Sequence, residues 1–225
     1  MTESASGAPK ELRGVIFDLD GVLVNSFEVM RQAFAFAYHE IVGAGDPPFE
    51  EYRKHMGRYF PDIMSDMGLP GELEGPFVRE SHRLAGQVLI YDGVPEMLTA
   101  LAGQGLRLAV ATGKSSPRAR SLLETLGLLG LFDSVIGSDE VRRPKPAPDI
   151  VLLALRQLGL SADQAIMVGD APADLHSAHA AGVFAAAALW GEADEAELLG
   201  ARPDVTLTRP ADILSLLVPA VISGA

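Results

Sequence analysis

Asp18 and Asp20 stand two residues apart at the end of the apolar segment GVIFDL, which begins at Gly14. If this segment forms a strand, residues two apart point to the same side, and the two carboxylates then face each other. Like charges that close repel unless a cation or a proton offsets them. The two carboxylates therefore predict that a ligand binds beside them.

Further polar residues follow the next apolar segments of the chain. Thr112 ends LRLAVAT, Lys145 follows SVIGS within RRPKPAPD, and Asp170 ends AIMVGD. Open parallel sheets bind ligands in the crevice at the carboxyl ends of their strands. We therefore expect these side chains to gather at one edge of a sheet, where acids, a hydroxyl and a lysine would meet.

The elements that must position these residues show an alternating pattern. Short apolar segments, rich in Val, Ile, Leu or Ala, begin at Gly14, Leu106, Ser134, Ala165, Val183 and, more weakly, Asp204. Most are separated by stretches with helical spacing, which is typical of buried parallel strands joined by crossover helices. The sequence predicts an α/β fold with a Rossmann-like parallel sheet flanked by helices.

One long stretch, from about Ser26 to Ile90, contains no convincing strand. Its clearest patterns are helical, in FEVMRQAFAFAYHEIV and FEEYRKHMGRYFPDIMSDMG. The stretch is too long for an ordinary connection between a strand and a helix. We predict a small helical cap domain, residues 26–90, inserted after the first strand of a core formed by residues 1–25 and 91–225. Gly93 and Pro95 mark the turn and the helix start at which the chain returns.

The composition excludes several classes of protein. The chain has no cysteine, so it has no disulfide, zinc–thiolate site or cysteine nucleophile, and a cytoplasmic location is the default. A formal net charge of −12 argues against nucleic-acid or membrane-surface binding. The N-terminal MTESASGAPK lacks the apolar region of a secretory signal and predicts a mobile tail, and no apolar stretch is long enough to span a membrane. We leave monomer or homodimer open.

A site that binds both a metal ion and a phosphate would account for all of these polar residues. Asp18 and Asp170 offer the oxygen ligands that Mg²⁺ prefers, together with a substrate phosphate. Lys145 supplies a positive charge, while Thr112 and the amides near Gly113 can donate hydrogen bonds to phosphoryl oxygens. These residue types predict a site that binds a phosphate group.

Four segments together resemble the haloacid dehalogenase superfamily, in its subgroup of small-molecule phosphatases and phosphomutases with a helical cap. Phosphoglycolate phosphatase and beta-phosphoglucomutase are of this kind. The segments are FDLDGVLVNS, VATGK, RRPKPAPD and VGDAPADL, in that order and spacing. Each alone is a weak signal, but four in register at successive strand ends are a strong one. The resemblance spans nearly the whole chain from Gly14 onward.

The resemblance implies a division of roles between the first two acids. Asp18 is the nucleophile that forms an aspartyl-phosphate, and Asp20 protonates the leaving oxygen and then activates the hydrolytic water. The side chains of Asp18 and Asp170 and the main-chain carbonyl of Asp20 hold Mg²⁺. Dehalogenases of the superfamily need neither the second acid nor Mg²⁺, so Asp20 together with VGDAPAD favours phosphoryl transfer.

The resemblance also implies which residues surround the phosphoryl group. Thr112 and Lys145 orient it, and Asp174 is an outer acid that positions a metal-bound water or Lys145. Gly113 and Lys114 follow the threonine and are expected near the phosphate. Independently of the resemblance, the basic segment KHMGRYF in the predicted cap makes Arg58 the expected substrate contact there.

For Arg118, the residue pattern favours a solvated position over a contact with the substrate. It follows the threonine signature by a few residues, within a stretch of helical spacing. Charged residues on such stretches usually lie on a solvated face, and we expect that for this arginine.

The sequence therefore predicts an Mg²⁺-dependent phosphatase that acts through an aspartyl-phosphate, with phosphoglycolate or a sugar phosphate as generic substrates. A sugar phosphomutase of the same family is the alternative, because the core residues do not separate the two. A non-catalytic binding or regulatory protein is a further alternative. The intact set of site residues argues against it.

Overall fold

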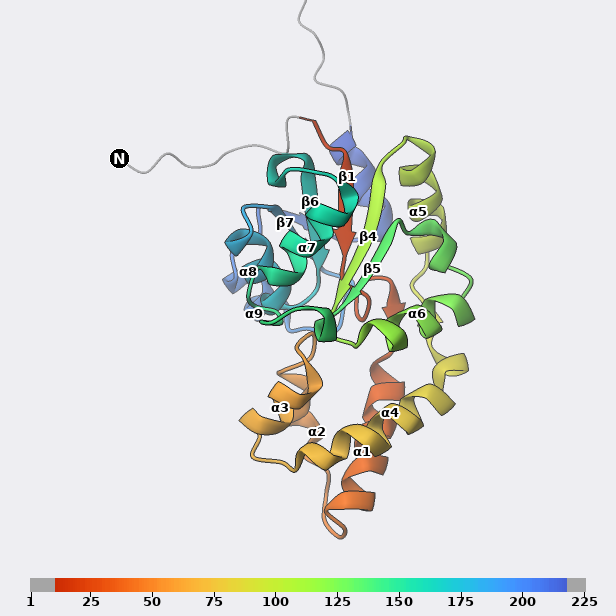
Figure 1. The fold of residues 1–225 in the computed structure, drawn as a ribbon, viewed down its shortest axis with the longest axis vertical. Coiled ribbons are helices and arrows are strands. Elements are labelled where there is room, and N and C mark those ends of the chain that lie inside the picture. Colours follow the sequence, from red (N-terminus) through yellow and green to blue (C-terminus); the bar gives the residue numbers. More distant parts are fainter. Residues whose placement is uncertain (1–10, 218–225) are drawn as a thin grey trace, which may run out of the picture.

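The computed structural model describes residues 11–217, so the predicted N-terminal tail lies outside the described residues. Within them, six parallel strands form one sheet in the order β5-β4-β1-β6-β7-β8. Helices cover both faces of this sheet (Figure 1). The predicted α/β fold with a Rossmann-like sheet is confirmed.

All six predicted strands are present at the predicted segments. They are β1 (Gly14–Phe17), β4 (Arg107–Thr112), β5 (Ser134–Gly137), β6 (Ala165–Gly169), β7 (Phe184–Ala188) and β8 (Val205–Leu207). The α-helices around them are α5 (Val94–Gly103), α6 (Ser116–Thr125), α7 (Asp149–Leu158), α8 (Pro172–Ala180) and α9 (Glu195–Gly200). The 3₁₀ segments are η3 (Leu129–Leu131), η4 (Ser138–Glu140), η5 (Ala162–Gln164) and η6 (Pro210–Leu217).

Successive apolar side chains of β1, β4, β5, β6 and β7 enter two separate apolar layers. In β1, Val15 and Phe17 pack into the layer that includes α5 and α6, while Ile16 packs with α7 and α8. This alternation follows from the pleat of the strand. In β7 the same alternation is made by alanines, with Ala186 on the first side and Ala187 on the second. Because both faces are buried, these strands are almost continuously apolar.

The chain between β1 and β4 is mostly helical, as predicted. It contains α1 (Phe27–Ile41), α2 (Phe49–Arg53), α3 (Phe60–Asp66) and α4 (Glu74–Arg83), with the 3₁₀ segments η1 (Gly71–Leu73) and η2 (Ala85–Gln87). These helices share their own apolar cluster, in which the rings of Phe34 and Tyr52 stack with centroids 4.6 Å apart. The division into a core and a cap domain stays a prediction.

Two details of this stretch differ from the prediction. β2 (Val24–Asn25) pairs antiparallel with β3 (Leu89–Ile90), so a short strand does occur before the return point. This strand is β3, and its partner β2 lies before residue 26. The sequence pattern within residues 26–90 therefore does not reveal the pairing. The helical patch that begins at Phe49 contains two helices, because Gly57 takes a φ of +84° and a new helix begins at Phe60, with Pro61 in its first turn.

The carboxyl ends of the parallel strands point toward the group α1–α4. Figure 1 shows β1 running in that direction, with α1–α4 beyond the end of the sheet.

None of the helices within residues 11–217 has both the length and the apolar character that a membrane-spanning helix needs.

Candidate active site

Three strand ends deliver polar side chains to one place. Asp18 directly follows β1, Thr112 is the last residue of β4, and Asp170 directly follows β6. Since β1 pairs with both β4 and β6, the three residues are neighbours across the sheet, as predicted. The hydroxyl oxygen of Thr112 accepts a hydrogen bond from the amide of Lys114 at 3.3 Å, which leaves its O–H able to donate to a ligand.

Asp20 does not share a strand with Asp18, and that expectation is wrong. The strand ends at Phe17, and the chain turns at once. The Asp20 carboxylate accepts hydrogen bonds from Lys114 Nζ and Ser26 Oγ. Burial alone would raise the pKa of Asp20, but the charge of Lys114 and these hydrogen bonds lower it below its usual value. The two acids therefore have different partners and different protonation behaviour.

Lys145 lies between two buried carboxylates. Its Nζ is 3.0 Å from Asp18 Oδ1 and 2.5 Å from Asp174 Oδ1, and it donates to the carbonyl of Ala111 at 3.2 Å. Burial alone would lower the pKa of Lys145, but the two carboxylates raise it, so the ammonium is retained. The other oxygen of Asp174 accepts from the amide of Ala171 at 3.1 Å. Asp174 thus uses both oxygens to hold Lys145 and the start of α8.

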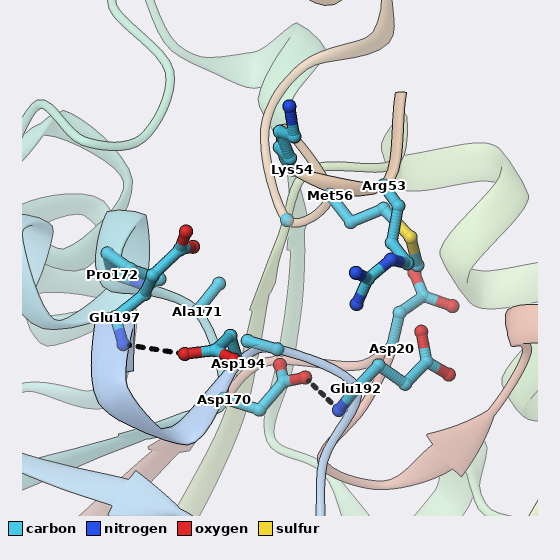
Figure 2. Close-up of a pocket in the computed structure, with 12 residues that line it drawn as sticks. Asp20, Arg53, Lys54, Met56, Asp170, Ala171, Pro172, Glu192, Asp194 and Glu197 are labelled. Atoms are coloured by element: carbon cyan, nitrogen blue, oxygen red, sulfur yellow. Dashed lines mark hydrogen bonds between the residues drawn. The ribbon is translucent and has the colours of Figure 1, made fainter. Parts of the chain in front are cut away.

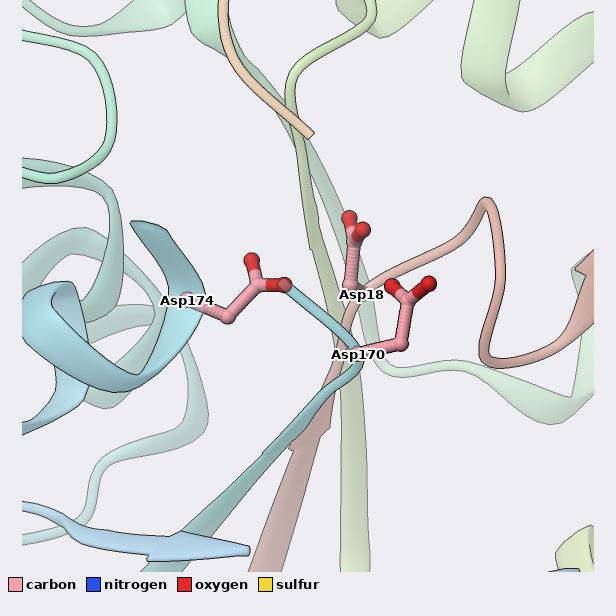
Figure 3. A group of neighbouring side chains, drawn as sticks. All are labelled: Asp18, Asp170 and Asp174. Atoms are coloured by element: carbon pink, nitrogen blue, oxygen red, sulfur yellow. The ribbon is translucent and has the colours of Figure 1, made fainter. Parts of the chain in front are cut away.

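One oxygen of Asp18 has no partner within the described residues. This atom, Oδ2, is buried, and Asp18 belongs to a group of three acids whose ligand atoms lie within 4.8 Å of one another (Figure 3). Burial raises the pKa of Asp18 to about 7 and raises that of Asp170 well above its usual range, with contributions from the charge of Asp174. A buried carboxylate oxygen without a hydrogen-bond partner lowers the free energy of unfolding. The donor set therefore fits a divalent cation between Asp18 and Asp170.

Asp170 is held by close approach of the main chain. Its Oδ2 accepts from the amide of Glu192 at 2.9 Å, as Figure 2 shows. A Cβ atom added at Gly21 would lie 1.9 Å from this oxygen, and one at Gly191 would lie 2.2 Å from the Asp170 Cβ. Only glycine allows both segments to lie so near, and Gly21 also takes a φ of +78°.

Glu192 is a site residue that the sequence reasoning missed. It lines a pocket beside Asp20 and Asp170 (Figure 2). Its Oε1 accepts from the amide of Phe27 at 3.1 Å, while Oε2 is buried without a partner in the described part of the chain. Burial and the charge of Asp20 raise the pKa of Glu192 to about 8. Glu192 lies in the loop between β7 and α9, and the rule about strand ends points to this loop.

The loop of residues 54–59, between α2 and α3, covers the strand ends. A Cβ atom added at Gly113 would lie 2.6 Å from the carbonyl oxygen of Arg58 and 2.7 Å from that of Gly57. A pocket under this loop is lined by Asp18 and Thr112 on the side of the sheet and by Tyr52 on the side of the inserted helices. The site is thus enclosed between the sheet and the insertion.

The predicted basic contacts lie at this pocket but have partners of their own. Arg58 lines it, yet its Nη2 donates to Asp66 at 2.7 Å. Lys114 also lines it, and its ammonium is paired with Asp20. Arg118 was expected on a solvated face, and this is wrong, since its side chain borders the same pocket and contacts α4. The contact joins segments far apart in the sequence, so the helical pattern alone does not reveal it.

Comparison with known proteins decides the family. Residues 15–188 match the family described as haloacid dehalogenase-like hydrolase. The chain belongs to this family. A probable phosphatase, IndB, from Dickeya dadantii is 37% identical over 214 residues, which cover 85% of this chain and 87% of that protein. A phosphoglycolate phosphatase from Aquifex aeolicus is 31% identical over 211 residues, covering 92% and 97% of the two chains.

A solved structure of a member of the same family has the same fold. The haloacid dehalogenase-like hydrolase SP0104 from Streptococcus pneumoniae superposes with a TM-score of 0.80 at 25% identity, covering 92% of this chain and 99% of that one. The predicted enzyme class, a phosphoric monoester hydrolase of the haloacid dehalogenase family, is confirmed.

Proposed function

We propose that this hydrolase is an Mg²⁺-dependent phosphatase that cleaves a small phosphorylated metabolite through an aspartyl-phosphate on Asp18. The observation that supports this most strongly is the environment of the Asp18 carboxylate. Lys145 donates a hydrogen bond to Oδ1, whereas Oδ2 is buried and has no hydrogen-bond partner within the described residues. A carboxylate fixed by one oxygen presents the other in a defined direction, as in-line attack on phosphorus requires. Phosphoglycolate or a sugar phosphate is the substrate type, and the name of the Aquifex aeolicus relative supports it.

In this mechanism Asp18 Oδ2 attacks phosphorus while the bond from phosphorus to the ester oxygen breaks. The hydroxyl of Thr112 and the amide of Gly113 donate to the phosphoryl oxygens, and Lys145 keeps the nucleophile oriented. Asp20 gives a proton to the leaving oxygen and later takes one from the water that hydrolyses the aspartyl-phosphate. The roles of these residues remain part of the proposal.

The pair of Asp20 and Lys114 bears on that proton transfer. Lys114 keeps Asp20 ionised in this arrangement, whereas a general acid must carry a proton. A phosphate brought next to Lys114 would draw its ammonium away from Asp20, and the pKa of Asp20 would then rise. In this arrangement Lys114 would contact the substrate phosphate, as predicted from the sequence.

Mg²⁺ would be held by the side chains of Asp18 and Asp170 and by the main-chain carbonyl of Asp20. When bound, the ion supplies positive charge that offsets the phosphoryl group and the crowded acids. Asp174 has both oxygens engaged with Lys145 and Ala171, which supports an outer position for it. The cytoplasmic location stays a prediction.

Inorganic phosphate release tests the proposal. The panel contains phosphoglycolate, sugar phosphates, amino-sugar phosphates and nucleotides, each with Mg²⁺ and with a chelator. We expect one class to be cleaved, and only with the metal. Release that a chelator does not reduce would contradict the metal requirement. Turnover that needs a bisphosphate activator would indicate the sugar phosphomutase instead.

A further inference from the structure

Arg118 brings a positive charge to the pocket that contains Asp18. The residue lies in α6, directly after the strand that carries Thr112, yet its side chain reaches the inserted helices. Its Nη2 donates to Ser81 Oγ at 3.1 Å, and its guanidinium carbon lies 5.3 Å from the centre of the Phe77 ring. The guanidinium and the proposed nucleophile therefore border one cavity.

This guanidinium has no carboxylate within ion-pair distance among residues 11–217. The other arginines of that range without such a partner are all exposed, namely Arg120, Arg142, Arg156 and Arg202. Arg118 is partly buried, and its contacts are a neutral hydroxyl and an aromatic ring. Withdrawing a charge from water without a counter-charge is unfavourable. A charge kept in that state beside a catalytic pocket points to a negatively charged ligand.

Tyr52 adds a second donor on the wall of the same pocket. Its side chain is almost fully buried and stacks on Phe34, and its hydroxyl makes no hydrogen bond within the described residues. Burial raises the pKa of Tyr52, so the hydroxyl stays protonated. Asp20, an acid on the wall of the same pocket, is already paired with Lys114. Apart from the hydrogen bond from Arg118 to Ser81, the donors of Arg118 and Tyr52 at this pocket have no acceptor within residues 11–217.

We propose that Arg118, assisted by Tyr52, binds a carboxylate carried by the leaving group of the substrate. The planar guanidinium matches the two oxygens of a carboxylate and can bind both at once. This inference rests on the proposed function and narrows its substrate class to short phosphate esters of hydroxy acids. A carboxylate held there, away from the reacting phosphorus, also helps to orient the ester for attack.

The test compares two esters of similar length, phosphoglycolate and ethyl phosphate, which differ by a carboxylate in place of a methyl group. Arg118→Gln removes the charge and keeps hydrogen-bonding capacity. Arg120→Gln is the matched control, because Arg120 is exposed, lies on the same helix and also lacks an ion pair. We expect Arg118→Gln to lower kcat/KM for phosphoglycolate by about 10- to 100-fold. For ethyl phosphate the change should be small, and Arg120→Gln should affect neither ester.

Tyr52→Phe gives a second, independent variant. It should lower kcat/KM for phosphoglycolate in the same selective way but by less, since it removes one neutral donor. An equal loss for both esters in both variants, at unchanged far-UV circular dichroism, would show a merely structural role and overturn the inference.

Binding measurements keep the inference testable if turnover is absent. Calorimetric titration of Asp18→Asn with each ester should show tighter binding of phosphoglycolate, and the preference should disappear when Arg118→Gln is added. Equal affinity of the two esters would overturn the carboxylate site, whereas selective binding without any turnover would contradict only the proposed function. A preference for pyrophosphate that depends on Arg118 would also overturn it, since the second anion would then be a phosphate.

Discussion

Lys145 is the only cation that contacts the buried acids Asp18 and Asp174 within the described residues. Each of the three side chains is at most 1% exposed, so water screens none of these charges. A buried ion pair contributes little compared with a well-packed apolar pair, but loss of one partner leaves the other charge unpaired. The arrangement makes Lys145 as important for folding as for holding the nucleophile.

Lys145→Met should therefore destabilise the protein strongly. We expect the free energy of unfolding at neutral pH to fall by about 3–5 kcal/mol, because two buried carboxylates lose their counter-charge. Urea denaturation in the presence of a chelator measures it. Lys54→Met is the control, since Lys54 forms an exposed pair with Glu51 at 2.7 Å and such pairs contribute about 0–1 kcal/mol. Similar losses in the two variants would contradict this account of the buried pair.

At this scale the sequence predicted the residues that strand ends deliver. Asp18, Thr112 and Asp170 follow or end apolar strands, and the position of each is visible in a linear pattern. The pairing of Asp20 with Lys114 and the position of Arg118 against α4 were not predicted, because each joins residues far apart in the sequence. Packing between segments distant in the chain leaves no local signature.

At the scale of elements, the loop of residues 54–59 closes over Gly113. The carbonyl oxygens of Gly57 and Arg58 lie where a side chain at position 113 would begin. The sequence pattern predicted helical structure on both sides of Gly57 and did not predict the loop between them. The positive φ of Gly57 explains the break between α2 and α3, because this conformation turns the chain into a loop that lies against the site.

Gly113→Ala should displace this loop while leaving the sheet intact. The added methyl group would lie 2.6 Å from a main-chain oxygen, so the loop must retreat from the pocket. We expect kcat/KM for phosphate release to fall at least about tenfold, since even small misplacement around a bound substrate is costly. Gly130→Ala is the control, because a Cβ atom there meets nothing within 4 Å and its φ is not positive. Unchanged activity in Gly113→Ala would show that loop closure is unimportant.

At the scale of the whole molecule, an acidic chain gathers three acids into one buried group. The formal net charge is −12, and Asp18, Asp170 and Asp174 lie close together at the end of the sheet. The alternation of apolar strands and helical stretches predicted this sheet and its active edge. The order of the strands depends on tertiary packing, which the pattern does not encode.

Mg²⁺ should stabilise the whole fold through this group. A ligand that binds only the folded state at about 100 times its Kd adds about 2.7 kcal/mol to the free energy of unfolding. We expect Mg²⁺ to do so for the wild type and to have little effect on Asp170→Asn. In a chelator, Asp170→Asn should be at least as stable as the wild type, because it removes one crowded acid.

The exposed Asp46→Asn is the control for that comparison and should keep the full effect of Mg²⁺. Urea denaturation with and without the metal gives both quantities. Equal stabilisation of Asp170→Asn and the wild type by Mg²⁺ would place the ion elsewhere.

The most direct test of the central claim is detection of a phosphoryl group on Asp18. The measurement uses Asp20→Asn, which should hydrolyse the intermediate slowly, with an aryl phosphate whose leaving group needs no acid. Rapid acid quenching followed by mass spectrometry of the peptides should locate one phosphoryl group on Asp18. Asp18→Asn, alone or combined with Asp20→Asn, should show neither the label nor phosphate release. Phosphate release without any covalent label, or near-normal turnover by Asp18→Asn, would contradict the account.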